Sequence, residues 1–205
     1  MRYLREMVLI DPIQKLILEE NVQAVDRAAE RVKALEDHMR IRLEKWVRQP
    51  FVKALQAFRG FQMVAAMVVT SELGDLTRFD HPRKLMDYLG LVPSEVSSGK
   101  KRHQGAITKS GNSHVRWILV EIARHYANAP KVSKELSVRQ EGIDNPVKEL
   151  SWRTQKRLYK RYVRLQMRRL HENKIKVAIA RELTAFIWEL AQIQKDQDPM
   201  KTSAA

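Results

Sequence analysis

The feature that most constrains the fold of this chain is a heptad spacing of apolar side chains near its amino terminus. From Leu18 to Trp46 these side chains recur alternately four and three residues apart, with one polar interruption at Glu36. The spacing predicts one long helix with a narrow apolar seam. The seam comprises Leu18, Val22, Val25, Ala29, Val32, Met39, Leu43 and Trp46. Such a seam has to be covered, either within the helix's own domain or by a second copy of the chain.

The rest of the sequence also predicts helices, so we expect an all-α fold. Pro50 suits the boundary between the long helix and the next one. Two apolar helices between Phe51 and Leu73 are interrupted at Arg59-Gly60-Phe61, which resembles a helix-hairpin-helix. In that motif backbone amides after the glycine hold a phosphate, but Gln62 stands where a second glycine is common. Gly60 is therefore either a DNA contact or a plain structural turn. A last helix from Val177 to Ile193 is expected to close the bundle through Ala180, Leu183, Ile187, Trp188 and Ala191.

The charge of the chain indicates the class of its partner. There are 38 Lys and Arg against 24 Asp and Glu, which leaves a formal charge of +14. We expect a nucleic acid, because Lys and Arg drive its nonspecific binding through counterion release. The absence of cysteine excludes disulfides, thiolate nucleophiles and cysteine-based zinc sites. The six histidines are scattered and Asp75 and Asp80 suit turns and caps, so we assign no metal to this chain. With no long apolar run or signal-like start, we expect a cytoplasmic protein that does not contact a membrane.

The segment from Gly90 to Arg116 brings hydroxyl groups and cations together. Ser97-Ser98-Gly99 directly precedes Lys100-Lys101-Arg102, and no carboxylate lies between Glu95 and Glu121. A hydroxyl among cations is suited to attack a phosphodiester, because the positive field holds DNA and stabilises developing negative charge. A basic surface loop with turn-forming Ser and Gly would give the same pattern.

Further along this segment, Lys109 lies in the turn Thr108-Lys109-Ser110-Gly111-Asn112, from which we expect it to reach the serine. Asn112 or Ser113 is expected to cap the next helix, with Arg116 in its first turn. A cation there is unfavourable for the helix dipole. A bound anion would relieve this, so Arg116 is a candidate to hold a phosphate.

A polar stretch from Asn128 to Ser151 is expected to separate this core from a second basic region. Between Trp152 and Lys176 there are ten Lys or Arg and a single acid, Glu172. We expect this helix to follow a nucleic-acid backbone through Arg153, Arg157, Lys160 and Arg161. Its aromatic residues, Trp152, Tyr159 and Tyr162, either pack inward or stack on bases.

Taken in order, these motifs resemble the carboxy-terminal transposase domain of the insertion-sequence-110/116/902 family. The matching residues are Ala57-Phe58-Arg59-Gly60, Glu72-Leu73-Gly74-Asp75, Arg78-Phe79, Leu89 to Ser94, Ser97-Ser98-Gly99, Gly105, Ile107-Thr108-Lys109, Gly111-Asn112, Arg139-Gln140-Glu141-Gly142, Ala178 to Leu183 and Phe186-Ile187-Trp188. They lie within residues 15–195. Members of the family are serine-type recombinases that move insertion sequences.

The resemblance implies that Ser98, the serine before the glycine, is the catalytic nucleophile and forms a phosphoserine linkage to DNA. Ser97 is the neighbouring alternative. The expected DNA contacts are Gly60, Lys100, Lys101, Arg102, Lys109, Gly111, Asn112, Arg116, Arg153, Arg157, Lys160 and Arg161.

The expected organisation is an assembly helix of coiled-coil type over residues 1–48, a helical transposase domain over 49–195 and a disordered tail over 196–205. Within the domain lie a catalytic serine loop, residues 94–112, and a basic helix, residues 151–176. The resemblance further implies a homo-oligomer formed through the heptad helix, and a structured guide RNA as a partner.

The resemblance also implies that full-length members of the family carry an additional amino-terminal half. This half is ribonuclease-H-like, and its acidic tetrad binds Mg²⁺. We expect this half, with its metal, to be missing here. On that reading the chain is the serine half of an enzyme and needs the acidic half for activity. The alternatives are an inactive nucleic-acid-binding and dimerisation remnant that regulates the intact transposase, or a structural protein that associates with nucleic acid through charge alone.

Overall fold

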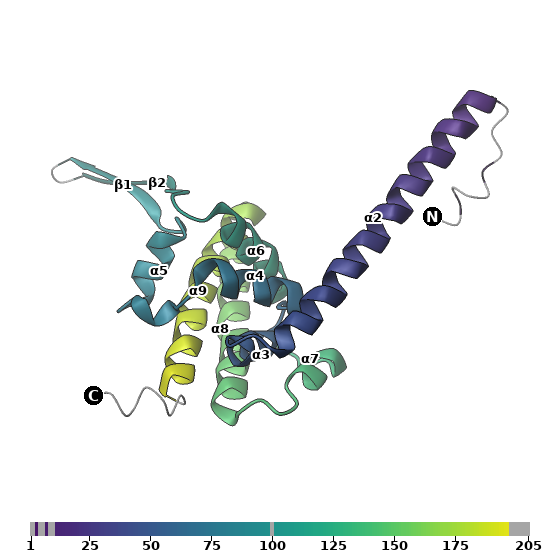
Figure 1. Ribbon diagram of the computed structural model, residues 1–205. Coiled ribbons are helices and arrows are strands. Elements are labelled where there is room, and N and C mark those ends of the chain that lie inside the picture. The colour runs from purple at the N-terminus through teal and green to yellow at the C-terminus, as the bar shows by residue number, and fades with distance from the viewer. Residues whose placement is uncertain (1–2, 4–6, 8–10, 99–100, 197–205) are drawn as a thin grey trace. The chain divides into compact units, whose positions relative to one another are not determined.

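The computed structural model describes residues 3, 7, 11–98 and 101–196, with the backbone alone for residues 95–98, 101–104 and 196. The expected disordered tail therefore lies, from residue 197 onward, outside the described residues. The chain divides into two compact units, Met1–Trp46 and Val47–Ala205, which we treat separately. Helices dominate both units (Figure 1), so the all-α class is confirmed, with a single hairpin of strands as an addition.

Unit 1 consists mainly of one long helix, α2, from Pro12 to Glu44. Asp11 caps it, since its carboxylate accepts hydrogen bonds from the amides of Ile13 and Gln14 at 2.7 and 3.4 Å. Among the residues of α2 only Leu43 is buried. The predicted apolar seam thus lies on one helix from Leu18 to Leu43, whereas Trp46 lies beyond its end, and among the described residues of unit 1 no second helix packs on the seam.

Unit 2 is a helical bundle that carries the hairpin. Its elements are α3 (Gln49–Gln56), α4 (Met63–Leu73), the 3-10 turn η1 (Leu76–Arg78), α5 (Pro82–Tyr88), β1 (Pro93–Ser98), β2 (Lys101–Ile107), α6 (Ser113–Ala123), the 3-10 turn η2 (Arg124–Ala127), α7 (Lys134–Arg139), α8 (Asn145–Met167) and α9 (Glu172–Asp196). Pro50 lies in the first turn of α3, where its missing N–H costs nothing.

Helix α9 forms the centre of unit 2, because it packs against α3, η1, α5, α6 and α8. Ile179, Leu183 and Ile187 are fully buried on it. The apolar face predicted for the last helix is confirmed, and the indole Nε1 of Trp188 adds a hydrogen bond of 2.6 Å to the carbonyl oxygen of Phe79. This contact ties α9 to the segment that leads into α5.

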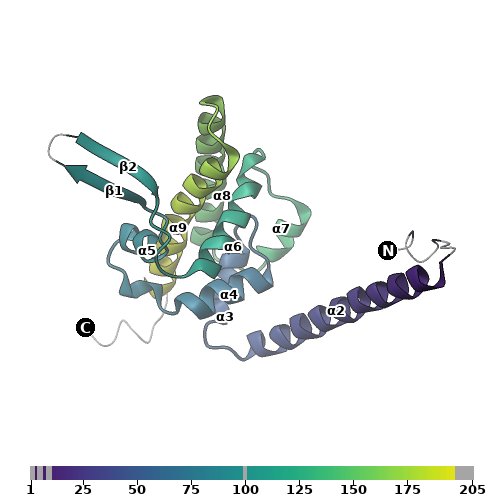
Figure 2. The ribbon, with the colours of Figure 1, turned by 90° about the horizontal axis from the view of Figure 1, so that it is seen from above.

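The segment expected to be an irregular serine loop, residues 94–112, instead contains an antiparallel hairpin. Pro93 pairs with Ile107 and Ser98 with Lys101, with a register shift between Pro93 and Glu95. Figures 1 and 2 show the hairpin projecting from the helices beside α5. Little in the sequence indicates this hairpin, because Ser, Lys, Arg and Gly are weak strand formers and no regular apolar alternation marks the strands.

The stretch from Asn128 to Ser151 does not separate two regions, contrary to our expectation. It contains α7 and the start of α8, and its polar side chains bind the turn between α3 and α4. The side-chain amide of Gln140 donates to the carbonyl oxygen of Ala57 at 2.9 Å, and the hydroxyl of Ser151 donates to the same oxygen at 2.7 Å. The second basic region is therefore built onto the same core.

Candidate functional site

The base of the hairpin is defined here as residues 88–93 and 108–112, two segments whose backbones lie in direct contact. The amide of Thr108 donates to the carbonyl of Val92 at 2.9 Å, and that of Lys109 donates to the carbonyl of Gly90 at 3.1 Å. Gly90 and Gly111 have φ angles of 61° and 72°. A Cβ on either glycine would overlap the opposite segment, at the carbonyl oxygen of Ser110 or of Tyr88. Only glycine fits these two positions, for reasons of both φ and space.

Arg116 joins the two segments of this base. Its Nη1 donates to the carbonyl oxygen of Leu89 and to that of Ser110, both at 2.9 Å. We expected Arg116 to hold a phosphate, but the structure gives this nitrogen two backbone partners. The cation thus relieves the unpaired carbonyls of two tight turns, which is a structural role that charge alone did not reveal.

Glu72, at the end of α4, anchors the start of α6 beside this base. Its two carboxylate oxygens lie 2.6 Å from the Asn112 amide nitrogen and 2.6 Å from His114 Nδ1. The hydrogen bond from Asn112 lowers the pKa of the Glu72 carboxyl, against an opposing effect of burial, and His114 lowers it further. Asn112, one of the two caps proposed for this helix, accepts a hydrogen bond from the amide of Val115 at 2.9 Å. Sequence reasoning named Glu72 only among the residues that carry the family resemblance and missed this anchoring role.

Trp117, beside the hairpin base, is a large exposed aromatic side chain that the sequence analysis did not single out. It lies on α6 opposite the buried face of Val115, Ile118 and Leu119, and 61% of it is exposed. Its ring is stacked on that of His114, with centroids 6.5 Å apart and planes inclined by 19°. A large aromatic residue on the polar side of an amphipathic helix was the available signal.

Ser98 is the last residue of β1, at the far end of the hairpin from its base. Its Cα is paired with that of Lys101, and Ser97 is paired with Arg102. Gly99 and Lys100 lie outside the described residues, as do the side chains of Ser97, Ser98, Lys101 and Arg102. The strand from Pro93 to Ser98 extends about 17 Å, at about 3.3 Å per residue.

Lys109 does not share this end of the hairpin, which corrects our expectation that it reaches the serine. It belongs to the base, where its amide is bonded to Gly90. It has a φ of 57°, a left-handed conformation that is uncommon for a residue with a side chain. Lys109 and Ser98 therefore lie at opposite ends of the hairpin, and a ligand would have to span the hairpin to contact both.

The Gly60 turn, between α3 and α4, faces the protein on one side. Gly60 has a φ of 88°, and a Cβ there would lie 2.9 Å from Ile122 and 3.0 Å from His125. Neighbouring carbonyls are bound by other elements: that of Arg59 accepts from the Tyr126 hydroxyl at 3.1 Å, and that of Phe61 accepts from Arg139. Packing alone thus accounts for this glycine, while a phosphate contact stays a prediction.

The basic residues in the middle of α8 have acidic partners on α9. Arg157 Nε lies 2.5 Å and Arg161 Nε 2.9 Å from the carboxylate of Glu182, while Arg153 pairs with Glu189. We expected a face of one sign, but the counter-charges come from a helix that is distant in sequence. Lys160 is exposed and has no ion pair among the described residues. Of the aromatic residues, Tyr162 is buried, while Trp152 is exposed with Lys156 over its ring at 5.8 Å.

Asp75 caps η1, as expected, whereas Asp80 forms an ion pair and the cap of α5 is its neighbour His81. The carboxylate of Asp75 accepts from the amide of Thr77 at 2.9 Å, and Asp80 pairs with Lys84 at 2.6 Å. In the described part of the chain, no three His, Asp or Glu side chains are grouped so that they could hold a metal ion. A search of the described helices found none long and apolar enough to cross a bilayer.

A large open cavity of about 990 Å³ lies elsewhere in unit 2, between α3, η1 and the ends of α8 and α9. Lys53, Asp144 and Lys195 are among the residues that line it, and none of its lining residues belongs to the hairpin or its base. The chemistry suggested by the sequence is therefore presented on a projecting hairpin and not in a cavity.

Comparison with known proteins places the hairpin within a family. The model of the transposase IS116/IS110/IS902 family matches residues 52–137, which include the hairpin and its base. A Sinorhizobium fredii protein named "Putative transposase y4qE" is 38% identical over 192 residues, covering 94% of this chain and 46% of the relative. A Coxiella burnetii protein named as the transposase for insertion sequence element IS1111A is 36% identical over 70 residues, covering 34% of this chain and 19% of that relative.

A protein of Pseudomonas aeruginosa named as a probable family 20 transposase is 33% identical over 73 residues, 36% of this chain and 22% of the relative. The chain thus spans less than half the length of each of these relatives. The matched region contains the Gly60 turn, the Glu72 anchor, both glycines of the hairpin base and Ser98. Residues 52–137 thus match the transposase domain of the IS116/IS110/IS902 family, and the chain as a whole is similar to the Sinorhizobium fredii protein.

Proposed function

We propose that this chain supplies the serine nucleophile and part of the DNA-binding surface of a transposase that acts by DNA strand transfer. The observation that carries the proposal is the position of Ser98 at the far end of a projecting hairpin, within the family match. The run Lys100-Lys101-Arg102 follows Ser98 in sequence after one glycine, Gly99. A nucleophile on a projecting hairpin is suited to a substrate as large as DNA, which could not enter a closed cavity.

In the proposed reaction the Ser98 Oγ attacks a phosphorus atom of DNA. The new Oγ–phosphorus bond replaces one bond between the phosphorus and a deoxyribose oxygen, which leaves as a hydroxyl. The serine gives up its proton and the leaving oxygen takes one up, so protons and charge balance. The phosphodiester energy is kept in the phosphoserine linkage, and a second DNA hydroxyl can reverse the step and join another end. Cations beside the serine would stabilise the charge that develops on the phosphoryl oxygens.

The rigid base of the hairpin supports this function by limiting the directions in which the serine can move. Misplacing a reacting group by about 1 Å can cost about a hundredfold in rate. A hairpin is a flexible element when only two strands hold it. Backbone contact at Gly90 and Gly111, fixed by Arg116, removes freedom at the point where it would matter most.

The test is a covalent adduct between protein and DNA. The chain, with the acidic half of a longer relative added, is incubated with nicked suicide DNA carrying an element end, and adducts are separated under denaturing conditions. We expect an adduct that is lost in Ser98→Ala and retained in Ser97→Ala. An adduct that survives Ser98→Ala and disappears in Ser97→Ala would move the nucleophile by one residue. Salt-sensitive DNA binding without any adduct would replace this proposal by that of a nucleic-acid-binding remnant.

We further propose that α2 assembles two copies of the chain through its apolar seam. Val25 and Val32 are 52% and 55% exposed, and burying a continuous row of such side chains is the usual source of coiled-coil stability. Val25→Asp with Val32→Asp is expected to convert a dimer into a monomer, as measured by sedimentation. Glu30→Asp, outside the seam, is the control. A wild-type chain that is monomeric at high concentration would contradict the assembly. A guide RNA, the other partner that the family resemblance implies, is tested by co-purification of RNA with the intact transposase.

A further inference from the structure

We propose that the corner between α8 and α9 binds the backbone of duplex DNA. The α8–α9 corner is defined here by four cations, Arg164, Arg168, Arg169 and Lys174. The proposal rests on the proposed function for the identity of the polyanion, and it assigns the contact to residues outside the family match at 52–137. It also moves the expected contact of α8 from the middle of the helix to its end.

The four cations of this corner are exposed and have no ion pair among the described residues. Arg164 and Arg168 lie one turn apart at the end of α8, and Lys174 lies in the first turn of α9. The single carboxylate between residues 164 and 176 is Glu172, which is already held by Lys176 at 2.6 Å. The carboxyl-terminal end of α8 favours nearby cations through the helix dipole. Four cations without a carboxylate of their own nevertheless repel one another, and a polyanionic ligand would relieve that repulsion.

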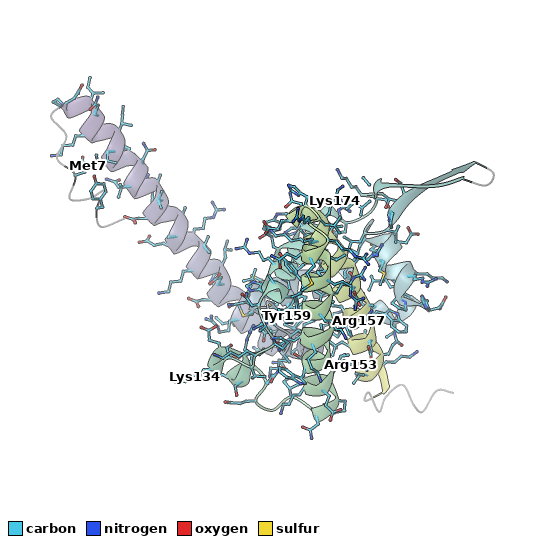
Figure 3. All side chains as sticks on the ribbon, turned by 180° about the vertical axis from the view of Figure 1, so that it is seen from behind. Met7, Lys134, Arg153, Arg157, Tyr159 and Lys174 are labelled. Carbon is cyan, nitrogen blue, oxygen red and sulfur yellow. The ribbon has the colours of Figure 1, made fainter. Side chains whose placement is uncertain are left out.

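The contrast with the middle of α8 makes the corner stand out. Arg153, Arg157 and Arg161 belong to the same helix, but the carboxylates of Glu182 and Glu189 neutralise them. A DNA phosphate would have to compete with those carboxylates, whereas the one carboxylate at the corner, Glu172, is paired with Lys176 and with none of the four cations. Figure 3 shows Arg153 and Arg157 along the length of the bundle and Lys174 at its end, where an extended duplex has access.

The backbone of Arg169 gives independent support. This residue has a φ of 55°, a conformation in which glycine or asparagine costs least and a long side chain is disfavoured. The turn between the two helices would therefore form more easily with glycine, yet the chain has an arginine there. A cation at this strained position is explained if its side chain contributes to binding.

Charge complementarity favours DNA as the occupant over a protein partner. The exposed apolar side chains of the corner, Met167 and Leu170, are scattered between cations. A protein interface would have to bury several arginines without acidic partners, at a large desolvation cost. Phosphates of a duplex can each accept from a guanidinium while the charges stay hydrated at the edge of the contact.

The experiment compares two triple variants of the whole chain that remove the same charge, one at the end of α8 and the turn after it, the other in the middle of α8. The first replaces Arg164, Arg168 and Arg169 by Gln, and the control replaces Arg153, Arg157 and Arg161 by Gln. Binding to a labelled duplex of about 25 base pairs is measured over a range of salt concentrations. We expect the corner variant to lower the slope of log affinity against log salt by about 2 to 3, since each phosphate contact contributes about 0.9. The control should change that slope by less than about 1.

A second variant, Arg169→Gly, separates binding from folding. It removes one cation and the unfavourable φ of its side chain together, so the melting temperature should stay equal or rise while DNA affinity falls. If Arg169 had only a structural role, its replacement would not lower DNA affinity while the melting temperature stayed equal or rose. Circular dichroism of each variant establishes that the fold is retained.

Equal slope changes in the two triple variants would overturn the proposal that the α8–α9 corner binds DNA. An Arg169→Gly variant with unchanged DNA affinity would overturn it as well. A wild-type chain without affinity for the duplex would do the same. A parallel measurement with duplex RNA of the same length tests the partner, and tighter RNA binding that depends on the same arginines would overturn the assignment to DNA. The serine chemistry is judged separately, by the covalent adduct, so each proposal can fail without the other.

Discussion

The base of the hairpin and the middle of α8 are two regions that the sequence marks as functional, and they are held in opposite ways. At the base, two backbone segments touch through Gly90 and Gly111, and Arg116 satisfies their carbonyls. In the middle of α8, arginines meet the carboxylates of Glu182 and Glu189 at the surface. The comparison teaches that glycines in a sequence can indicate tight turns and close backbone contacts directly. A row of cations indicates a ligand only once the charges on every neighbouring element are known.

The largest effect is expected at Gly111. Gly111→Ala adds a Cβ that overlaps the carbonyl oxygen of Tyr88 and a side chain at a φ of 72°. We expect a loss of about 3 to 5 kcal/mol in the free energy of unfolding, from strain and overpacking together. Urea unfolding measures it.

The matched control is Gly142→Ala, since Gly142 has a similar φ of 70° but no atom within 4 Å of the place that a Cβ would occupy. Only the backbone penalty of roughly 1 to 2 kcal/mol should remain there. Equal losses in the two variants would mean that the contact between the two segments of the base contributes nothing.

A smaller effect is expected at Arg116. Arg116→Ala leaves the carbonyls of Leu89 and Ser110 without their shared donor, which should cost about 2 to 3 kcal/mol. DNA affinity should change little, because the described guanidinium contacts are to the protein itself. Thermal unfolding and a DNA-binding titration on the same variant distinguish the two roles. Normal stability with lost affinity would restore the phosphate-holding role that the sequence suggested.

The anchor at Glu72 gives a pH dependence. In the folded chain the pKa of this carboxyl is below its ordinary value of 4.5, so its contribution to stability is complete above that pH. It is lost as the pH falls through the lower, folded-state value. Glu72→Gln should cost about 1 kcal/mol at neutral pH. The unfolding free energy of the Glu72→Gln variant should fall less than that of the wild type as the pH is lowered below 4.5. Parallel pH profiles of the two proteins would show that the hydrogen bonds from Asn112 and His114 do not depend on the charge.

The smallest effect on stability is expected at Glu182. Glu182→Gln breaks two ion pairs near the surface, each worth about 0.2 to 1 kcal/mol. It also frees Arg157 and Arg161, so DNA affinity should rise. Unchanged or weaker DNA binding would indicate that the ion pairs do not restrict these arginines, and the contrast between the middle and the end of α8 would lose its basis.

Periodicity predicted most of the helical fold correctly. The buried face of α9, the Pro50 boundary, the break at Gly60 and the cap at Asn112 all follow from local spacing and from residues with one strong conformational preference. The hairpin was not foreseen, because its strands contain only one β-branched residue each, Val96 and Ile107, and no regular apolar alternation. The partners of Arg116 and Arg157 were not foreseen either, since both depend on segments brought together only by the tertiary fold.

The central claim is that Ser98 is the nucleophile of a DNA transposase, and mapping the covalent adduct to one residue tests it most directly. The adduct formed on suicide DNA would be digested with nuclease and protease, and the modified peptide would be sequenced by mass spectrometry. We predict a nucleotide joined through its phosphate to the Oγ of Ser98, in the peptide that contains Ser97-Ser98-Gly99. A nucleotide joined to a tyrosine, or to a serine outside the hairpin, would contradict the claim.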